Sequence, residues 1–281
     1  MSEKPPLWPA HLHHLCIRTP QPDALASWYS DNLELSAEPL DDGRIRLRGR
    51  ERNLVLQPSS EPGLGFAAYA VSAPAQVAGL RDRGSQKDMT QADVSSPLFT
   101  DDQVAIADPD GNAFVYGIPS DGKPQGHDAL PGRLQHVGIT TTDIGRLIDF
   151  YTGQMGFRAS DIVSNDDGAV SACFLRCDDE HHALALFAAS SSRFDHQCYE
   201  TTCWNDIRDW GDHFSKRRTI IEWGAARHGA GNNLFIFVRD PDRNPVELSA
   251  ELETRPYDAP PGQWKTEERT LNLWGSAWSR T

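Results

Sequence analysis

The feature that most constrains the fold of this chain is an internal repeat. Residues 12–17 read LHHLCI, and residues 134–139 read LQHVGI. An offset of 122 residues aligns these segments, and the same offset separates Tyr29 from Tyr151. Each segment is a short, mostly apolar strand candidate that precedes a helical pattern. The 281 residues are therefore expected to contain two copies of one fold.

A second repeated motif lies near the end of each copy. Residues 108–112 read DPDGN, and residues 240–244 read DPDRN. Between the copies, residues 122–132 contain two prolines and three glycines, which is typical of a linker. We therefore expect an N-terminal domain over residues 1–121, a linker over 122–132, a C-terminal domain over 133–252 and a tail over 253–281.

Hydrophobic spacing predicts how each copy is built. In the second copy, the sequence predicts strands near 134–141, 171–177, 181–188, 195–203, 220–228, 232–239 and 245–251, and helices near 143–154 and 205–218. The first copy has strand composition at 65–71 and 104–116, and the last 30 residues have no clear element. The expected class is α+β, with two domains that each contain paired strand–helix–strand–strand–strand (βαβββ) units.

Composition limits the partners of such a protein. The chain has 40 acidic and 27 basic residues, a net charge of −13 and no run of more than three basic residues. This balance argues against nucleic acid and anionic membranes as partners. No apolar stretch approaches the roughly 20 residues that span a bilayer, and the first residues lack the apolar segment of a secretion signal. The five cysteines fit neither a disulfide framework nor a zinc motif, so we expect a cytoplasmic protein.

Three residues of the second copy are candidates for a metal site. His136 lies within an apolar strand candidate, His196 begins another, and Glu247 lies on the last. Two imidazoles and one carboxylate can form a facial triad that leaves coordination positions open. This ligand set is typical of non-haem Fe(II) oxygenases, although Mn(II) and Zn(II) also accept it.

The first copy is an internal control for this assignment. His14 corresponds to His136, but Phe66 corresponds to His196 and Val115 to Glu247. A residue needed only for the fold is expected in both copies, whereas the complete ligand set occurs in the second copy alone. We therefore interpret the second copy as the metal-binding domain and the first as a scaffold.

Together these motifs resemble the vicinal-oxygen-chelate superfamily and, within it, the type I extradiol ring-cleaving dioxygenases. The resemblance covers residues 10–250. The family signature near the last ligand has Gly-x-x-x-His, an apolar-Tyr pair, Asp-Pro and Glu. Here it reads Gly224 to His228, Ile236-Phe237, Asp240-Pro241 and Glu247. The resemblance implies ring cleavage of a small aromatic diol by O₂ at Fe(II), with Mn(II) as an alternative metal, and we expect a homo-oligomer.

The resemblance also implies a role for individual residues. It makes His136, His196 and Glu247 the metal ligands, His182 an acid–base group and His228 a hydrogen-bonding partner of the substrate hydroxyl. Phe237 occupies the position of the usual tyrosine, and phenylalanine cannot donate a hydrogen bond or a proton. Since His181 and His182 are adjacent, only one of them is expected to face the site.

Other interpretations remain open. Phe237 leaves room for a metal-dependent isomerase, lyase or hydrolase that uses Zn(II), Mn(II) or Ni(II), and a non-catalytic small-molecule-binding protein is a third hypothesis. Glu200 and Glu251 are alternative ligands, since they share strand faces with His196 and Glu247. Arg227 and Arg243 are either surface charges or partners for an anionic ring substituent. The Trp-rich tail is expected to pack against the second domain or to cover its site.

Overall fold

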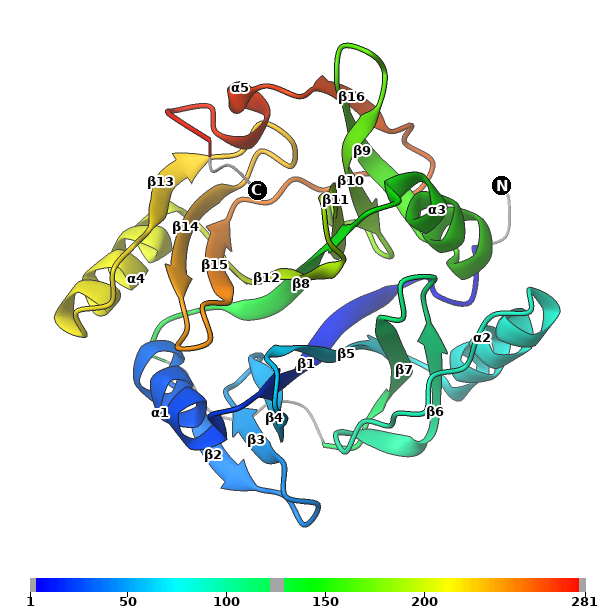
Figure 1. Ribbon diagram of the computed structural model, residues 1–281, viewed down its shortest axis with the longest axis horizontal. Helices are drawn as coiled ribbons and strands as arrows, with labels where there is room; N and C mark the ends of the chain where they lie inside the picture. Colours follow the sequence, from blue (N-terminus) through cyan, green and yellow to red (C-terminus); the bar gives the residue numbers. More distant parts are fainter. Residues whose placement is uncertain (1–3, 122–128, 278–281) are drawn as a thin grey trace.

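The structure is a computed structural model that describes residues 4–121 and 129–277. Two β-sheets lie side by side with helices around them (Figure 1), which confirms the α+β class. Most of the predicted linker, residues 122–128, and the end of the tail, including Trp278, lie outside the described residues. Over the described ranges, the helices are too short or too polar to cross a membrane.

The order of elements repeats along the chain. The first half contains β1 (Ala10–Thr19), α1 (Pro22–Leu33), β2 (Ser36–Pro39), β3 (Ile45–Arg48), β4 (Asn53–Pro58), β5 (Gly63–Val71), α2 (Pro74–Gln86), β6 (Phe99–Ala107) and β7 (Ala113–Pro119). The second half contains β8 (Arg133–Thr141), α3 (Ile144–Asp149), the π-helical turn η1 (Phe150–Met155), β9 (Arg158–Ser164), β10 (Val170–Arg176), β11 (Leu184–Ala188), β12 (Arg193–Thr201), α4 (Trp204–Lys216), β13 (Trp223–Arg227), β14 (Leu234–Arg239), β15 (Pro245–Ala250), β16 (Gly262–Lys265) and α5 (Glu268–Leu271).

The two sheets share one strand order when one of them is read in reverse, and the second sheet has two further strands, β13 and β16. The order is β2-β3-β4-β1-β5-β7-β6 in the first sheet and β13-β14-β15-β12-β8-β11-β10-β9-β16 in the second. The expected arrangement of paired βαβββ units is confirmed, although the described residues of the first half contain no strand equivalent to β13. A single bridge between Gln91 and Ile106 stands where that strand would pair.

Three local predictions are corrected. The predicted strand 104–116 is two strands, because the Asp108 turn reverses the chain between β6 and β7. Strand β9 was not predicted, since its polar and charged residues give it little apolar periodicity. The tail, which was expected to have no element, contains β16 and α5. Strand β16 pairs in parallel with β9, so the tail extends the second sheet.

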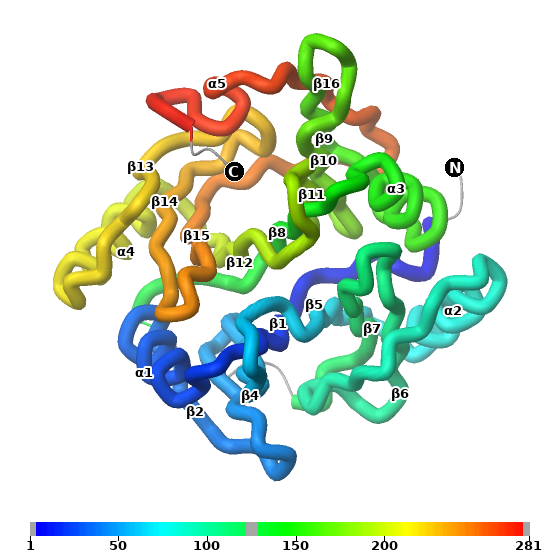
Figure 2. The backbone as a smooth tube through the Cα atoms, viewed as in Figure 1, coloured from blue at the N-terminus to red at the C-terminus, as the bar shows by residue number. Residues whose placement is uncertain are grey.

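The tail also joins the two edges of the second sheet. From β16 beside β9, the chain continues through α5 toward β13 on the other side (Figures 1 and 2). The amide nitrogen of Leu273 donates to the carbonyl of Arg227 on β13 (2.8 Å). The tail therefore packs against the second sheet and closes the curve that its strands form.

Side chains of the central strands point alternately to the hydrophobic core and to the candidate site. On β8, Val137 and Ile139 belong to the large core cluster, which includes residues of both sheets and of α1, α2 and α4. His136 and Gly138 point to the opposite face because successive strand residues alternate. That face carries smaller apolar clusters, which contain Phe174, Phe187 and Phe237 among others.

The residues shared by both copies tie the two halves together. The Tyr29 hydroxyl donates to Asp240 Oδ2 (3.0 Å), and the Tyr151 hydroxyl donates to Asp108 Oδ2 (2.8 Å). Each aspartate also accepts hydrogen bonds from an asparagine of its own turn. The repeated tyrosine and Asp-Pro-Asp motifs therefore form reciprocal contacts between the halves, which explains why both copies retain them.

Candidate metal centre

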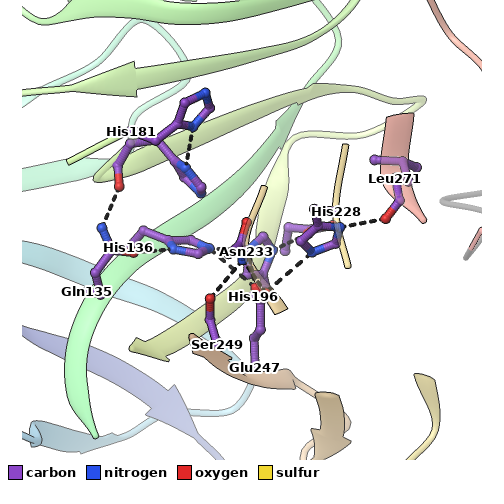
Figure 3. Close-up of polar contacts among 11 residues, drawn as sticks. Gln135, His136, His181, His196, His228, Asn233, Glu247, Ser249 and Leu271 are labelled. Atoms are coloured by element: carbon purple, nitrogen blue, oxygen red, sulfur yellow. Dashed lines mark hydrogen bonds and ion pairs between the residues drawn. The ribbon is translucent and has the colours of Figure 1, made fainter. Parts of the chain in front are cut away.

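The three candidate ligands meet on neighbouring strands of the second sheet. His136 lies on β8, His196 on β12 and Glu247 on β15, which are adjacent in the sheet. The two Nε2 atoms are 3.0 Å apart, and Glu247 Oε2 lies 3.4 Å from Nε2 of His136 and 3.6 Å from Nε2 of His196. All three side chains are buried and point toward one another (Figure 3). Within residues 4–121 and 129–277, no other set of three such side chains is close enough to share an ion.

Two β-bulges hold the histidine rings. The register between β8 and β12 shifts at Gln135 and at Asp195, the residues that directly precede the two histidines. Gln135 Oε1 lies 2.6 Å from Nδ1 of His136, and Asp195 Oδ2 lies 2.6 Å from Nδ1 of His196. Bulges beside active sites redirect side chains in this way. Both oxygens accept, so each Nδ1 carries the proton and each Nε2 has a lone pair.

The orientation of the Gln135 amide supports this assignment of protons. Its nitrogen donates to the carbonyl of His182 (2.6 Å) and to Glu180 Oε2 (3.1 Å), and both of these groups are acceptors. The amide oxygen must therefore face His136 (Figure 3).

The centre thus presents three acceptors to one small space. Burial lowers the pKa of His136 to about 4, so its ring is neutral at pH 7. Two neutral nitrogens and a carboxylate that converge without a donor between them fit a divalent cation. The cavity between them has a volume of about 20 Å³, which is room for one ion or water.

His181 and His182 point to different sides of their strand. His182 lines the cavity, with its ring centroid 4.2 Å from that of His136. His181 instead points to Asp161 Oδ2 (3.0 Å from Nε2), and its Nδ1 lies 3.0 Å from Nδ1 of His182. Since Nδ1 of His182 is used in the contact with His181, Nε2 is its remaining ring nitrogen.

His228 follows β13 and lies on the other side of the ligands. Its Nδ1 donates to the carbonyl of Leu271 in α5 (2.5 Å), so the tail fixes the ring. Its Nε2 lies 3.4 Å from Glu247 Oε1, and the ring stacks on Phe235 with 3.9 Å between centroids. Nε2 is therefore the ring nitrogen that faces the cavity.

Phe237 is buried in the cavity wall. Its ring stacks on Trp223 and meets the edge of the His196 ring. The neighbouring Asn233 donates to Ser249 Oγ (2.7 Å) and lies 3.4 Å from Glu247 Oε1. This side of the centre therefore combines an apolar wall with a polar group that holds the carboxylate.

The remaining sequence candidates lie away from the ligands. Glu200 accepts a hydrogen bond from the amide of Leu252 (2.9 Å), and Glu251 pairs with Arg227 (2.6 Å). Arg243 is largely exposed and pairs with Glu222 (3.1 Å). Neither arginine lines the cavity, and neither glutamate belongs to the ligand group.

The sheet register confirms the correspondence between the two copies. Cys16 pairs with Phe66 as Gly138 pairs with His196, and Ala68 pairs with Val115 as Cys198 pairs with Glu247. In the first sheet, Nε2 of His14 contacts Ser96 Oγ (2.7 Å). Apolar side chains therefore replace two of the three ligands there.

Comparisons with known proteins agree with this fold. The homoprotocatechuate 2,3-dioxygenase of Arthrobacter globiformis has a TM-score of 0.83 at 23% identity, covering 98% of this chain and 90% of that one. A Mn(II)-bound glyoxalase from Novosphingobium aromaticivorans has a TM-score of 0.82 at 21% identity, covering 94% and 90%. The described residues of both halves therefore share the fold of these two solved structures.

Sequence comparison relates the second half to a known superfamily. Residues 133–248 match the Glyoxalase/Bleomycin resistance protein/Dioxygenase superfamily. Metapyrocatechase 2 of Cupriavidus necator is 29% identical over 207 residues, which is 65% of this chain and 63% of that protein. The match thus spans less than two thirds of this relative. The resemblance inferred from the sequence is confirmed.

Proposed function

We propose that this protein is an extradiol dioxygenase, which cleaves the ring of a catechol-type or polyhydroxylated aromatic with O₂ at a mononuclear Fe(II) site. His136, His196 and Glu247 would hold the ion, with Mn(II) as the alternative metal. The observation that carries this proposal is the convergence of two Nε2 lone pairs and one carboxylate on a single small cavity. The similarity to metapyrocatechase 2 supports the type of reaction.

The ion and the surrounding residues have separate tasks in this proposal. When bound, Fe(II) would supply the Lewis acidity and redox chemistry that couple an aromatic diol to O₂. His182 would accept a proton at Nε2, since its Nδ1 is used by His181. His181 and Asp161 would keep that tautomer in place.

His228 and the aromatic wall would orient the substrate. Nε2 of His228 would accept a hydrogen bond from a substrate hydroxyl, because its Nδ1 donates to Leu271. Phe174, Phe187 and Phe237 line the cavity and would exclude water from it. Phe237 can neither donate nor transfer a proton, so the polar steps would depend on the two histidines.

Phe237 also favours a second candidate function. A metal-dependent isomerase, lyase or hydrolase could use the same ligand set with Zn(II), Mn(II) or Ni(II) and would not need a tyrosine at this position. A non-catalytic binding protein is less well supported, since binding an organic molecule does not require three convergent metal ligands.

Metal analysis and oxygen uptake separate these functions. The protein would be purified anaerobically, its metals measured, and oxygen consumption followed with a panel of catechols after reconstitution with Fe(II) or Mn(II). Iron or manganese near one per chain with catechol-dependent oxygen uptake supports the dioxygenase. Bound metal without oxygen uptake supports the second candidate, and no metal binding supports the third.

We also propose the domain boundaries 1–121 and 133–252, since each sheet is formed mainly within one of these ranges. All five cysteines are free, which supports the reducing cytoplasm as the compartment. The proposed homo-oligomer would be tested by light scattering of the purified protein.

A further inference from the structure

A second cavity adjoins the metal centre. It has a volume of about 180 Å³ and shares three lining residues with the metal cavity, namely Phe187, Thr270 and Leu271. The metal cavity itself, at about 20 Å³, is too small for an aromatic ring. An engineered apolar cavity of about 150 Å³ binds benzene, so the adjoining cavity is large enough for a ring-sized group.

The adjoining cavity changes from apolar to polar along its length. Val163, Ala172 and Phe187 line it and are buried in one apolar cluster of the second sheet. Thr266 and Glu267 line it too and are exposed, so the cavity runs from the centre toward solvent. None of the described residues that line it is a lysine, an arginine or a histidine.

The tail forms one wall of this cavity. Thr270 is buried, and its carbonyl accepts hydrogen bonds from the amides of Gly229 (3.0 Å) and Ala230 (3.3 Å). Its hydroxyl donates to the carbonyl of Lys265 (2.5 Å). These contacts hold α5 over the sheet, so the shape of the cavity is set by the tail as well as by β9, β10 and β11.

We propose that this cavity binds the end of the substrate remote from the two hydroxyls, and that this end is apolar and uncharged. The inference rests on the proposed dioxygenase function and names its substrate class. A carboxylate there would lose water without gaining a cationic partner and would meet the carboxylate of Glu267. Arg227 and Arg243 do not line the cavity and pair with acidic residues elsewhere.

A matched pair of substrates tests the charge preference. 3,4-Dihydroxyphenylacetate and its methyl ester have the same ring and attachment, but only the acid is anionic. We expect kcat/KM for the ester to exceed that for the acid by about tenfold or more, because only the ester avoids an unpaired buried charge. A preference for the acid, or equal values, would overturn the proposal.

Two variants with matched controls test the location. Ala172→Leu fills the inner part of the cavity, and Ala105→Leu makes the same change in the first sheet, far from it. Ala172→Leu should lower kcat/KM for the ester by about tenfold relative to Ala105→Leu, within the range that one or two methylenes contribute in a pocket.

A charge change at the outer end of the cavity is the second test. Glu267→Lys should raise the ratio of kcat/KM for the acid to kcat/KM for the ester several-fold, whereas Glu268→Lys at the next exposed position should not. Equal behaviour of each variant and its control would place the substrate elsewhere.

Binding to the metal-free protein gives a readout that does not depend on catalysis. Benzyl alcohol and benzoate differ in charge but carry one ring each, and both can be titrated calorimetrically. We expect benzyl alcohol to bind more tightly than benzoate and to lose affinity in Ala172→Leu. If catechols are cleaved but this preference is absent, the proposed role of the cavity is wrong, while the proposed dioxygenase function stands. If the preference is present but no catechol is cleaved, the proposed function fails and the apolar site remains.

Discussion

Gly138 and His196 face each other across β8 and β12, and the histidine ring lies where a side chain at position 138 would begin. They form a register pair, and a Cβ atom built on Gly138 would overlap the imidazole of His196. In the first sheet, Cys16 and Phe66 form the corresponding pair. Gly138, in residues 134–139 of the second copy, therefore makes room for a metal ligand.

Gly138→Ala should displace the His196 ring while leaving the fold in place. Overpacking of this kind typically costs about 1–3 kcal/mol, and we expect Fe(II) affinity to fall by about tenfold or more, as when groups that orient ligands are lost. Gly153→Ala is the control, because a Cβ there meets no atom within 4 Å. Metal titration and thermal unfolding would be measured together. Unchanged metal affinity in Gly138→Ala would contradict the role of the glycine.

The repeat allowed much of the fold to be predicted. An offset of 122 residues aligned the opening strands, and the register of the two sheets reproduces that alignment. Strand β9 was missed because its stability comes from pairing with β10 and β16, which local periodicity does not reveal. The tail was missed for the same reason, since β16 contributes only one edge to a sheet formed by distant residues.

The candidate site could be predicted only in part. The ligands stood out because the first copy has Phe66 and Val115 in place of two of them. Gln135 and Asp195, which orient the ligand rings, were not identified, because a bulge depends on the partner strand. The one signal in the sequence was a hydrogen-bond acceptor immediately before each histidine. The apolar cavity beside the centre also escaped prediction, since it is assembled from three strands and the tail.

His196→Ala should remove metal binding and activity together. Two remaining ligands hold a divalent ion weakly against water, so we expect metal content to fall at least tenfold. His14→Ala is the matched control, since His14 is the equivalent histidine of the first sheet and contacts Ser96 rather than a ligand group. It should change metal content and activity by no more than a few-fold. Loss of metal in His14→Ala would reverse the roles assigned to the two sheets.

The pH dependence of stability should depend on His13. Burial, together with the charge of His11, lowers its pKa from 6.5 to about 4. Between pH 4 and 6.5, the unfolded chain binds more protons at His13 than the folded chain does. The contribution of His13 to the free energy of unfolding is therefore present above pH 6.5 and is lost as the pH falls to about 4. The slope is at most about 1.4 kcal/mol per pH unit for one proton.

Other groups titrate in the same pH range, so the effect of His13 on stability must be measured as the difference between wild type and a His13 variant. Burial raises the pKa of Asp178 and of Glu200 to about 7, and these carboxyls act in the opposite direction over the same window. Urea unfolding of metal-free wild type and His13→Gln would be compared at several pH values from 4.5 to 7. We expect the stability of wild type relative to the variant to decrease toward acid pH. A pH-independent difference would contradict the low pKa of His13.

His228→Ala should impair the reaction more than a change at Phe237. Loss of one hydrogen bond to a charged group costs about 1.5–3 kcal/mol, or roughly ten- to a hundredfold in rate. Phe237 has no hydroxyl to replace that bond, so we expect a loss of at least this size. Phe237→Tyr adds only a hydroxyl at the cavity wall and should be tolerated, with a higher rate on simple catechols as the favourable outcome. Oxygen uptake with a panel of catechols would measure both variants. If His228→Ala cleaved every substrate as wild type does, the substrate-binding role of His228 would be wrong, and the second candidate function would gain support.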